Sequence, residues 1–386
     1  MDALPLAPLS VAPLSVAPLP LAPLPLAQAL LRCRSETADR AGNRAAQDVL
    51  AAALAPAGFV ATWLPFGDTP NLFLRRGEGG PHLCFAGHTD VVPASGAWQH
   101  DPYSGTVDGG LLFGRGACDM KGAIAAFAAA AAGPTPGWGS VSLLITGDEE
   151  GPATDGTTRV LDWLAAHNQV PDACLVGEPT NPGTIGEVIK IGRRGSLNAT
   201  VTVRGMAGHV AYPHRADNPV HRLLRGLSAL TAAPLDAGSE WFEPSSLQVT
   251  SIDVGNAATN VIPGAASARL NIRFNDRHTG AALTHWLHAA LAPHAPDMTI
   301  DVVVSGESFL TTPGPFTALL SGAVQRVTGT IPRLDTGGGT SDARFVARYC
   351  PVAEFGLVGA TMHQVDECVP VADLQRLTEI YAAVLA

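Results

Sequence analysis

The sequence predicts an α/β protein, in which a mostly parallel sheet with covering helices carries a smaller inserted α+β domain. Three apolar segments, 82–88, 141–146 and 173–177, predict buried parallel strands, and acidic or imidazole side chains stand at the end of each. The Ala-rich segment 121–132 predicts a helix between the first two, so strand and helix alternate in the βαβ manner. From 195 to 305 apolar and polar residues alternate, which is typical of antiparallel strands.

The remaining elements follow from the same periodicities in chain order. Helical spacing from Gln28 to about Gly58 is followed by short predicted strands at 59–64 and 71–75. The inserted segment contains three predicted strands and one predicted helix: 196–204, 247–254 and 267–275, with the helix at 219–231. A last set returns the chain to the first domain: a helix at 316–328, an apolar strand at 351–355 and a final helix from Ala372.

The length of 386 residues exceeds one ordinary domain, so we expect two. We assign the first domain to 28–194 and 306–386, and the inserted domain to 195–305. Residues 1–27 form a Pro/Leu-rich low-complexity tail, whose five-residue repeat places prolines too often for a continuous helix. Such a tail cannot cross a membrane as a helix. Ala27 to Ala29 mimic a signal-peptidase site, but the basic leader of a secretory signal is missing.

Composition excludes several classes of function. The formal net charge is -10, from 34 acidic and 24 basic residues, and no run of Lys or Arg could follow a phosphate backbone, so nucleic acid is not an expected partner. The six cysteines include no C-x-x-C pair, and a chain of this size needs no disulfides to fold. We therefore expect a reduced, cytoplasmic protein without a membrane partner.

Five residues near the predicted strand ends and near the C-terminus form a candidate metal-ligand set: His88, Asp119, Glu150, Glu178 and His363. Zinc binds such nitrogen and oxygen donors, and its catalytic sites keep one position for water or substrate. In a two-metal site the ions lie about 3.5 to 4 Å apart, so one carboxylate should bridge them. We expect Asp119 to bridge two zinc ions, with cobalt or manganese as alternatives.

Two further acids near these ligands have predicted catalytic roles. Glu149 and Glu150 are adjacent and must diverge, so Glu150 is expected to bind metal while Glu149 faces the attacking water as general base. Asp90 lies two residues after His88, where its carboxylate could accept the second imidazole N–H and orient the ring. A helix cap is the structural alternative for Asp90.

Each group has a purely structural interpretation when taken alone. An Asp-Glu-Glu segment is usually a solvated loop or a helix start, and a single histidine is usually structural. The occurrence of all these groups together is harder to explain as purely structural, because several of them follow buried strands, where an uncompensated charge is costly.

These residues lie in segments that resemble the dinuclear zinc aminoacylase and carboxypeptidase family over about 28–386. The segments typical of the broad family are 87–93, 114–122, 146–150 and 177–180. The later segments are 192–196, 208–214, 260–263, 337–342 and 363–369, and they favour the branch that removes succinyl groups.

The resemblance implies a ligand assignment and a reaction. His88, Asp119 and Glu178 would hold one metal, Asp119, Glu150 and His363 the other, and the Asp119–Met120 peptide bond would be cis. Glu149 would be the base in hydrolysis of N-succinyl-L,L-2,6-diaminopimelate to succinate and L,L-2,6-diaminopimelate. The alternatives are another N-acyl amino acid deacylase of the family, such as one acting on N-acetylornithine, and a non-catalytic relative with a binding or assembly role.

The resemblance also implies a homodimer, in which the inserted domain serves for dimerisation and as a lid. His209 of one subunit would stabilise the oxyanion in the other, although Gly208 and Pro213 also fit a structural loop histidine. A dicarboxylic N-acyl amino acid would contact a set of polar residues: Arg193, Ser196, Tyr212, Asn260, Arg273, Gly339, Thr340 and Ser341. Arg273 could instead be a solvated edge residue of its strand, whereas a guanidinium fork suits a carboxylate.

Overall fold

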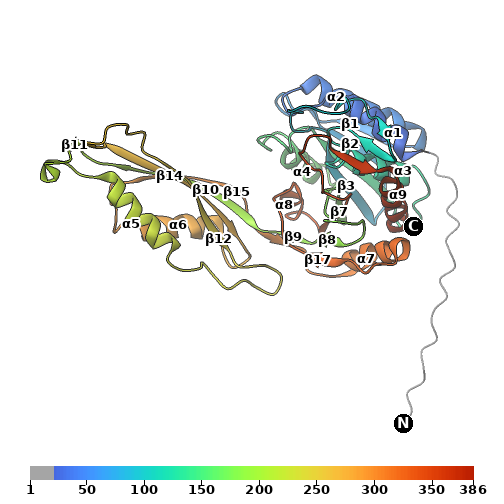
Figure 1. The fold of residues 1–386 in the computed structure, drawn as a ribbon. Coiled ribbons are helices and arrows are strands. Elements are labelled where there is room, and N and C mark those ends of the chain that lie inside the picture. The colour runs from blue at the N-terminus through green and yellow to red at the C-terminus, as the bar shows by residue number, and fades with distance from the viewer. Residues whose placement is uncertain (1–20) are drawn as a thin grey trace, which may run out of the picture.

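The computed structural model describes residues 21–386, so most of the predicted tail lies outside the described residues. Two lobes are visible in Figure 1: an α/β lobe that contains both the early and the late parts of the chain, and an elongated lobe built from the middle of the chain. The short strands β9 (Gly192–Arg193) and β16 (Phe309–Leu310) pair with each other where the chain passes between the lobes.

The α/β lobe is built on an eight-stranded sheet. Its strands are, in spatial order, β1 (Val60–Trp63), β2 (Leu72–Gly77), β6 (Ser140–Thr146), β3 (His82–His88), β7 (Ala173–Val176), β18 (Val352–Glu354), β8 (Val188–Lys190) and β17 (Arg333–Asp335). From β6 to β18 neighbouring strands run parallel, and β8 and β17 are also parallel. The pairs β1–β2, β2–β6 and β18–β8 are antiparallel. The predicted fold class, a mostly parallel sheet with covering helices, is confirmed.

Helices cover both faces of this sheet. Alternate residues of β3 enter different cores: Leu83 and Phe85 pack in one, Cys84 and Ala86 in the other. The first core includes residues of α1 (Pro23–Arg32), α2 (Arg40–Leu54), α3 (Lys121–Ala131), α7 (Pro315–Thr328) and α9 (Val371–Leu385). The second includes residues of α4 (Thr157–Ala166) and α8 (Ala343–Val346). Burial on both faces explains why the sequence of β3 is continuously apolar rather than alternating.

The first helix begins earlier than the sequence indicated. Helix α1 includes Pro23 to Ala27, which we assigned to the tail, and Leu26 and Ala27 are buried in the core. Its prolines are tolerated because the first turn of a helix has no hydrogen-bond acceptors for its N–H groups. Between Gln28 and about Gly58, where we expected helical spacing, the structure has two helices rather than one continuous helix. The chain breaks after α1, and Asp39 caps a second helix by accepting the N–H of Gly42 at 2.9 Å.

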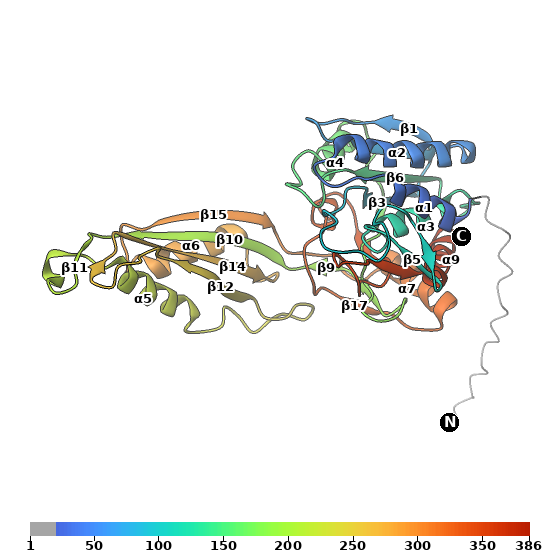
Figure 2. The same ribbon diagram turned by 45° about the horizontal axis from the view of Figure 1, so that its top comes forward.

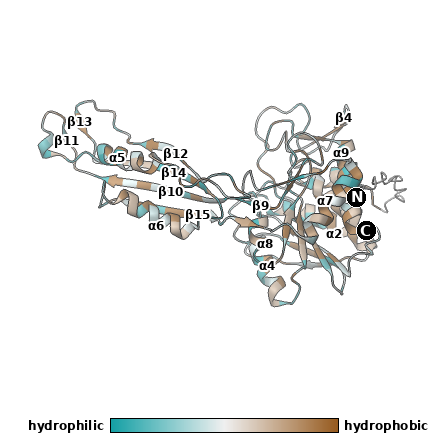
Figure 3. Cartoon of the chain, turned by 90° about the horizontal axis from the view of Figure 1, so that it is seen from below, coloured by the Kyte–Doolittle hydropathy of each residue, from teal (hydrophilic) through white to brown (hydrophobic). Residues whose placement is uncertain are grey.

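The elongated lobe has its own antiparallel sheet and its own core. The strand order is β12 (Ser246–Asp253), β14 (Ala265–Phe274), β10 (Gly195–Arg204) and β15 (Thr299–Gly306). Along β10 hydrophobic and hydrophilic residues alternate in Figure 3, and the apolar ones pack against α5 (Pro219–Thr231) and α6 (Gly280–Leu291). We predicted one helix here, which is wrong. The buried Leu283, Leu287 and Leu291 of α6 recur every four residues, a helical signal partly hidden by the other apolar residues around them.

Small strands complete the described part of the chain. At the far tip of the elongated lobe, β11 (Gly208–His209) pairs with β13 (Val261–Ile262). In the α/β lobe, β5 (Leu111–Phe113) pairs with both β4 (Val107–Asp108) and β19 (Cys368–Pro370). Within 21–386, the helices are all too short or too polar to reach across a lipid bilayer.

The docking of α1 gives a testable stability difference. Leu30 is fully buried in the core, so Leu30→Ala should lower the free energy of unfolding of the metal-free protein by about 2–5 kcal/mol through lost burial and the cavity left behind. Urea denaturation followed by circular dichroism measures this difference. Arg32→Ala, on the exposed side of the same helix, is the control and should change stability by less than about 0.5 kcal/mol. Equal stabilities of the two variants would show that α1 is not docked.

Candidate metal centre

Neighbouring parallel strands bring three of the predicted ligands to one edge of the sheet. His88 is the last residue of β3, Glu150 follows β6, and Glu178 follows β7. These strands are adjacent and parallel, so their carboxyl ends meet at the same edge, where ligands of open α/β sheets usually bind. Asp119 lies just before α3, and His363 lies in the loop between β18 and β19. The structure thus brings residues from five separate segments to this edge.

The five predicted ligands form two groups that meet at Asp119. One Asp119 oxygen, Oδ1, lies 3.1 Å from Nε2 of His88, and the other, Oδ2, lies 3.3 Å from Nε2 of His363. Glu178 approaches His88 to 3.7 Å, and Glu150 approaches His363 to 2.8 Å. Within each group the ligand atoms all lie within 4.8 Å of one another. Two imidazoles and three carboxylates in this arrangement fit two divalent cations with Asp119 between them.

Glu149 also lies at this centre. With His88 and Glu150 it forms a third group within 4.8 Å, so distance alone does not separate Glu149 from the ligands. Burial raises the pKa of the Glu149 carboxyl to about 8, with the neighbouring acids Asp342, Glu150 and Asp119 adding to the effect against the opposing charge of His88. Burial and the charge of Asp119 likewise raise the pKa of Glu178 well above its ordinary value.

The imidazoles respond in the opposite way. Hydrogen bonds with Asp119 and Glu150 raise the pKa of His363 to about 10. Burial opposes ionisation of His88, but Asp119 and the other carboxylates still raise its pKa well above the ordinary value. The pKa of Asp119 is lowered, because its contacts with both imidazoles outweigh its burial. Without cations, the negative charge of this cluster is therefore balanced by protons on the imidazoles and on the acids with raised pKa values.

Asp90 makes a different contact from the one we expected. The acceptor for Nδ1 of His88 is the backbone carbonyl of Asp90, at 2.8 Å, whereas the Asp90 carboxylate lies 3.7 Å from that nitrogen. The carboxylate instead accepts the backbone N–H groups of Glu149, at 3.2 Å, and Glu150, at 3.0 Å. The turn after β3 places the carbonyl beside Nδ1 of His88 and directs the side chain to the loop after β6. Asp90 therefore holds both glutamates, and the expected carboxylate–imidazole hydrogen bond is absent.

The predicted substrate-binding residues occupy three places. Arg193 is buried and its guanidinium pairs with Glu354 of β18, with Nε 2.9 and 3.1 Å from the two carboxylate oxygens, so it is not a free carboxylate receptor. The Ser341 hydroxyl donates to the same Glu354 at 2.8 Å. Gly339 and Thr340 lie in the loop before Ser341, and Thr340 lines a cavity of about 580 Å³ together with Glu149, Glu150 and part of β15.

Ser196 and Arg273 lie opposite each other on β10 and β14, at the end of the elongated sheet nearer the α/β lobe. His209, Tyr212 and Asn260 lie at the other end. His209 is in β11, its ring is 5.8 Å from that of Tyr212, and the nearby Val210 N–H donates to the carbonyl of Asn260 at 3.0 Å. Figures 1 and 2 both place β11 at the tip remote from β3. A single chain therefore does not bring its own His209 to its own metal-ligand cluster.

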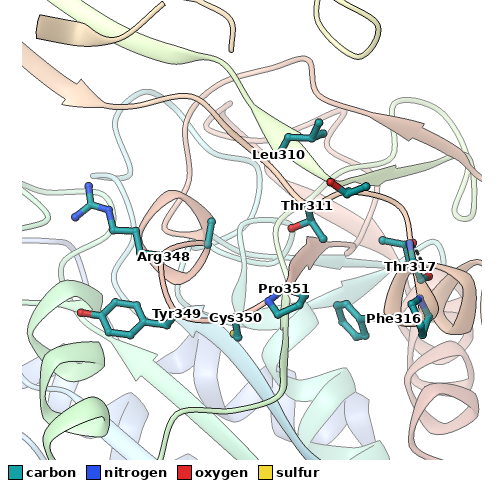
Figure 4. Close-up of a pocket in the computed structure, with 12 residues that line it drawn as sticks. Leu310, Thr311, Phe316, Thr317, Arg348, Tyr349, Cys350 and Pro351 are labelled. Carbon is teal, nitrogen blue, oxygen red and sulfur yellow. Dashed lines mark hydrogen bonds between the residues drawn. The ribbon is translucent and has the colours of Figure 1, made fainter. Parts of the chain in front are cut away.

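Two buried acids beside the predicted site, Glu354 and Glu367, were not predicted from the sequence. A charged residue within the apolar segment 351–355 was the available signal for Glu354, since a buried acid needs a partner. Glu367 had a weaker signal, its position four residues after His363. A separate hollow of about 460 Å³, lined by residues of 310–317 and 347–351, is shown in Figure 4, and none of the metal-ligand candidates lines it.

Solved structures with the same fold come from several peptidases. An M20 family metallo-carboxypeptidase from Sulfolobus solfataricus superposes with a TM-score of 0.75 at 16% identity, covering 94% of this chain and 98% of its own. A protein of Bacillus subtilis described as a dinuclear metal binding peptidase from the M20 family gives 0.69 at 14% identity, covering 94% and 97%. At such identities the likeness concerns the fold alone.

Sequence comparison gives a nearer relative and a family. A protein of Gluconacetobacter diazotrophicus named succinyl-diaminopimelate desuccinylase is 65% identical over 366 residues, which cover 92% of this chain and 94% of that protein. A family model described as peptidase family M20/M25/M40 matches residues 84–386, which include all five candidate metal ligands. The chain belongs to peptidase family M20/M25/M40.

Proposed function

We propose that this protein hydrolyses N-succinyl-L,L-2,6-diaminopimelate to succinate and L,L-2,6-diaminopimelate. The observation that carries the proposal is the pair of ligand groups that meet at Asp119, because this arrangement suits a two-metal amidohydrolase. The choice of acyl group and amine rests on the relatives, of which several at 54–65% identity are named succinyl-diaminopimelate desuccinylase.

The metals that we propose are two zinc ions, with cobalt or manganese as alternatives at one site. His88, Asp119 and Glu178 would hold one ion, and Asp119, Glu150 and His363 the other. When bound, the ions would polarise the amide carbonyl and make a water molecule more acidic.

Glu149 is the general base in the proposed reaction. Its carboxylate takes a proton from the attacking water as the new C–O bond forms at the succinyl carbonyl carbon. The same carboxyl group then gives that proton to the amine nitrogen as the C–N bond breaks. Bound cations favour the ionised carboxylate that this role needs, against the burial that raises the pKa of Glu149. Asp90 supports the base by fixing the backbone N–H groups of Glu149 and Glu150.

We assign the substrate contacts according to where the side chains lie. Ser196, Arg273, Gly339 and Thr340 would contact the carboxylates and the amide of the substrate. Arg193 and Ser341 would act through Glu354, the acid they both contact, by holding the loop that carries Gly339 and Thr340.

We further propose a homodimer in the cytoplasm. His209, with Tyr212 and Asn260, would reach the metal centre of the partner subunit, because each lies at the tip of the elongated lobe, away from its own centre. In this proposal 195–305 is the dimerisation and lid domain, and 28–194 and 306–386 form the catalytic domain. Six unpaired cysteines support a reducing compartment.

Hydrolysis should depend on metal, on Glu149 and on the succinyl group. We expect the zinc-loaded protein to release succinate from N-succinyl-L,L-2,6-diaminopimelate, a chelator to abolish this activity, and Glu149→Ala to lower kcat by at least about 100-fold while both zinc ions remain bound. A panel of N-succinyl and N-acetyl amino acids, including N-acetylornithine, measures specificity through kcat/KM. Faster hydrolysis of an N-acetyl substrate would replace the proposed function, and no hydrolysis by a zinc-loaded protein would indicate a non-catalytic relative.

Metal binding should release protons at neutral pH. The pKa of His363 is raised to about 10 in the metal-free protein, so at pH 7 its imidazole is protonated, and a cation must displace that proton. Zinc affinity should therefore fall as the pH is lowered. Calorimetric titration of zinc in buffers of different ionisation enthalpy counts the released protons. The variant His363→Asn should release fewer protons, and a binding enthalpy that is the same in all buffers for the wild type would contradict the prediction.

Mixing two inactive variants should restore activity if His209 acts on the partner's site. In a dimer of Glu149→Ala and His209→Ala subunits, one active site has lost both groups, whereas the other retains both. Random exchange of subunits should therefore recover about a quarter of wild-type activity, because about half of the dimers are mixed and each has one intact site. Activity assays after co-refolding or prolonged mixing measure this. Persistent inactivity of exchanged, folded dimers would show that His209 does not act across the interface.

A further inference from the structure

Glu367 is a buried acid whose carboxylate accepts hydrogen bonds from the loop that ends at Asp119. Its Oε1 accepts three backbone N–H groups, those of Gly116 at 3.1 Å, Cys118 at 2.9 Å and Asp119 at 3.2 Å. Its Oε2 accepts Nη1 of Arg115 at 2.7 Å. Three N–H groups from a short stretch of backbone form a concave site for an anion, and here the anion is a side chain of the same protein.

The backbone of Glu367 belongs to the loop that carries His363. The carbonyl of Glu367 accepts the N–H of Gly114 at 2.9 Å, and β19, which follows, pairs with β5. The loop is closed on itself by Thr361, whose hydroxyl lies 2.8 Å from the carbonyl and 3.1 Å from the N–H of Cys368. His363 adopts a left-handed conformation in this loop, with φ of 62°, which is uncommon for a non-glycine residue.

Asp119 and His363 are distant in sequence, and one buried carboxylate joins their two loops. We propose that Glu367 is a positioning residue that fixes Asp119 relative to His363 and so sets the affinity of the second cation site, formed by Asp119, Glu150 and His363. This inference rests on the two-metal centre of the proposed function. The site of His88, Asp119 and Glu178 depends less on Glu367, since His88 is the last residue of β3 and Glu178 lies two residues after β7.

A carboxylate is the side chain that suits this position. It only accepts hydrogen bonds, and here both of its oxygens face donors. In Glu367→Gln, the amide NH2 must face either Arg115 or the three backbone N–H groups. Whichever of these it faces loses its hydrogen-bond acceptor and meets another donor instead. The Asp119 loop, the Arg115 side chain or both must then shift.

The test compares Glu367→Gln with Asp366→Asn. Asp366 is the matched control, because it is the preceding residue, undergoes the same loss of charge, and its carboxylate accepts only the exposed N–H of Gln99 among the described residues.

Stepwise zinc dissociation constants are measured by competition with a chromophoric chelator, and the thermal midpoint is measured on the metal-free proteins. For Glu367→Gln we expect one of the two zinc dissociation constants to weaken about 10- to 100-fold and the other to change clearly less, as is typical when a residue behind the metal ligands is changed. Asp366→Asn should retain both constants.

Activity at high zinc separates positioning from general stability. If Glu367 acts on the second site, kcat of Glu367→Gln should recover towards the wild-type value as zinc is raised. A lower thermal midpoint with both zinc constants unchanged would overturn the inference and leave only a structural ion pair. Equal weakening of the two sites would also overturn it. If Glu367→Gln does not fold by circular dichroism, Glu367→Asp, which keeps the charge but withdraws it from the N–H groups, is measured against the same expectations.

Binding is measured without substrate, so failure of this inference is distinct from failure of the proposed reaction. A wild-type protein that binds two zinc ions but leaves the succinyl substrate intact would remove the proposed function and leave the role of Glu367 open to the same measurement of affinities. A wild-type protein that binds a single zinc ion would overturn the inference.

Discussion

The centre of this molecule depends on compensation of negative charge that is buried at the ends of parallel strands. Asp119 and Glu178 are almost fully removed from solvent, and Glu150 lies beside them. Carboxylates this close cannot all remain ionised without positive charge between them. In the bare protein the two imidazoles and the raised pKa values of Glu149 and Glu178 meet this requirement with protons. The chemistry of such a site suits divalent cations, because they can replace the protons that balance its charge.

The surrounding residues make this arrangement rigid mainly through backbone contacts. Asp90 fixes the N–H groups of Glu149 and Glu150, and Glu367 fixes those of the loop before Asp119. Both acids are themselves buried, and both bind peptide groups rather than the ligand side chains. The side chains of the candidate metal ligands are consequently placed by the paths of their loops, and neither the carboxylate of Asp90 nor that of Glu367 occupies their oxygen and nitrogen atoms. Glu354 has a comparable place beside the proposed substrate contacts, where it holds Arg193 and Ser341.

Much of this could be predicted from the sequence, for a physical reason. Buried parallel strands have a recognisable apolar composition, and their carboxyl ends meet, so His88 and Glu178 could be placed together before any coordinates. The partners of Asp90, Glu354 and Glu367 could not, because each depends on how a loop turns and on contacts between segments far apart in sequence. The break between α1 and α2 and the presence of α6 were missed for a related reason. An Ala- and Leu-rich segment keeps a helical composition whether or not the chain is interrupted, and only packing shows which residues are buried.

The early start of α1 has a consequence for the segment Ala27 to Ala29, which resembles a protease cleavage site. In the folded protein this segment lies within the helix, and Ala27 and Leu30 face the core. A processing enzyme needs an extended backbone, so it could cut there only after the helix had unwound. A cut after Ala29 would also separate Leu26 and Ala27 from the domain and expose the apolar surface of α3 and α9 that they cover, which would favour self-association of the shortened protein.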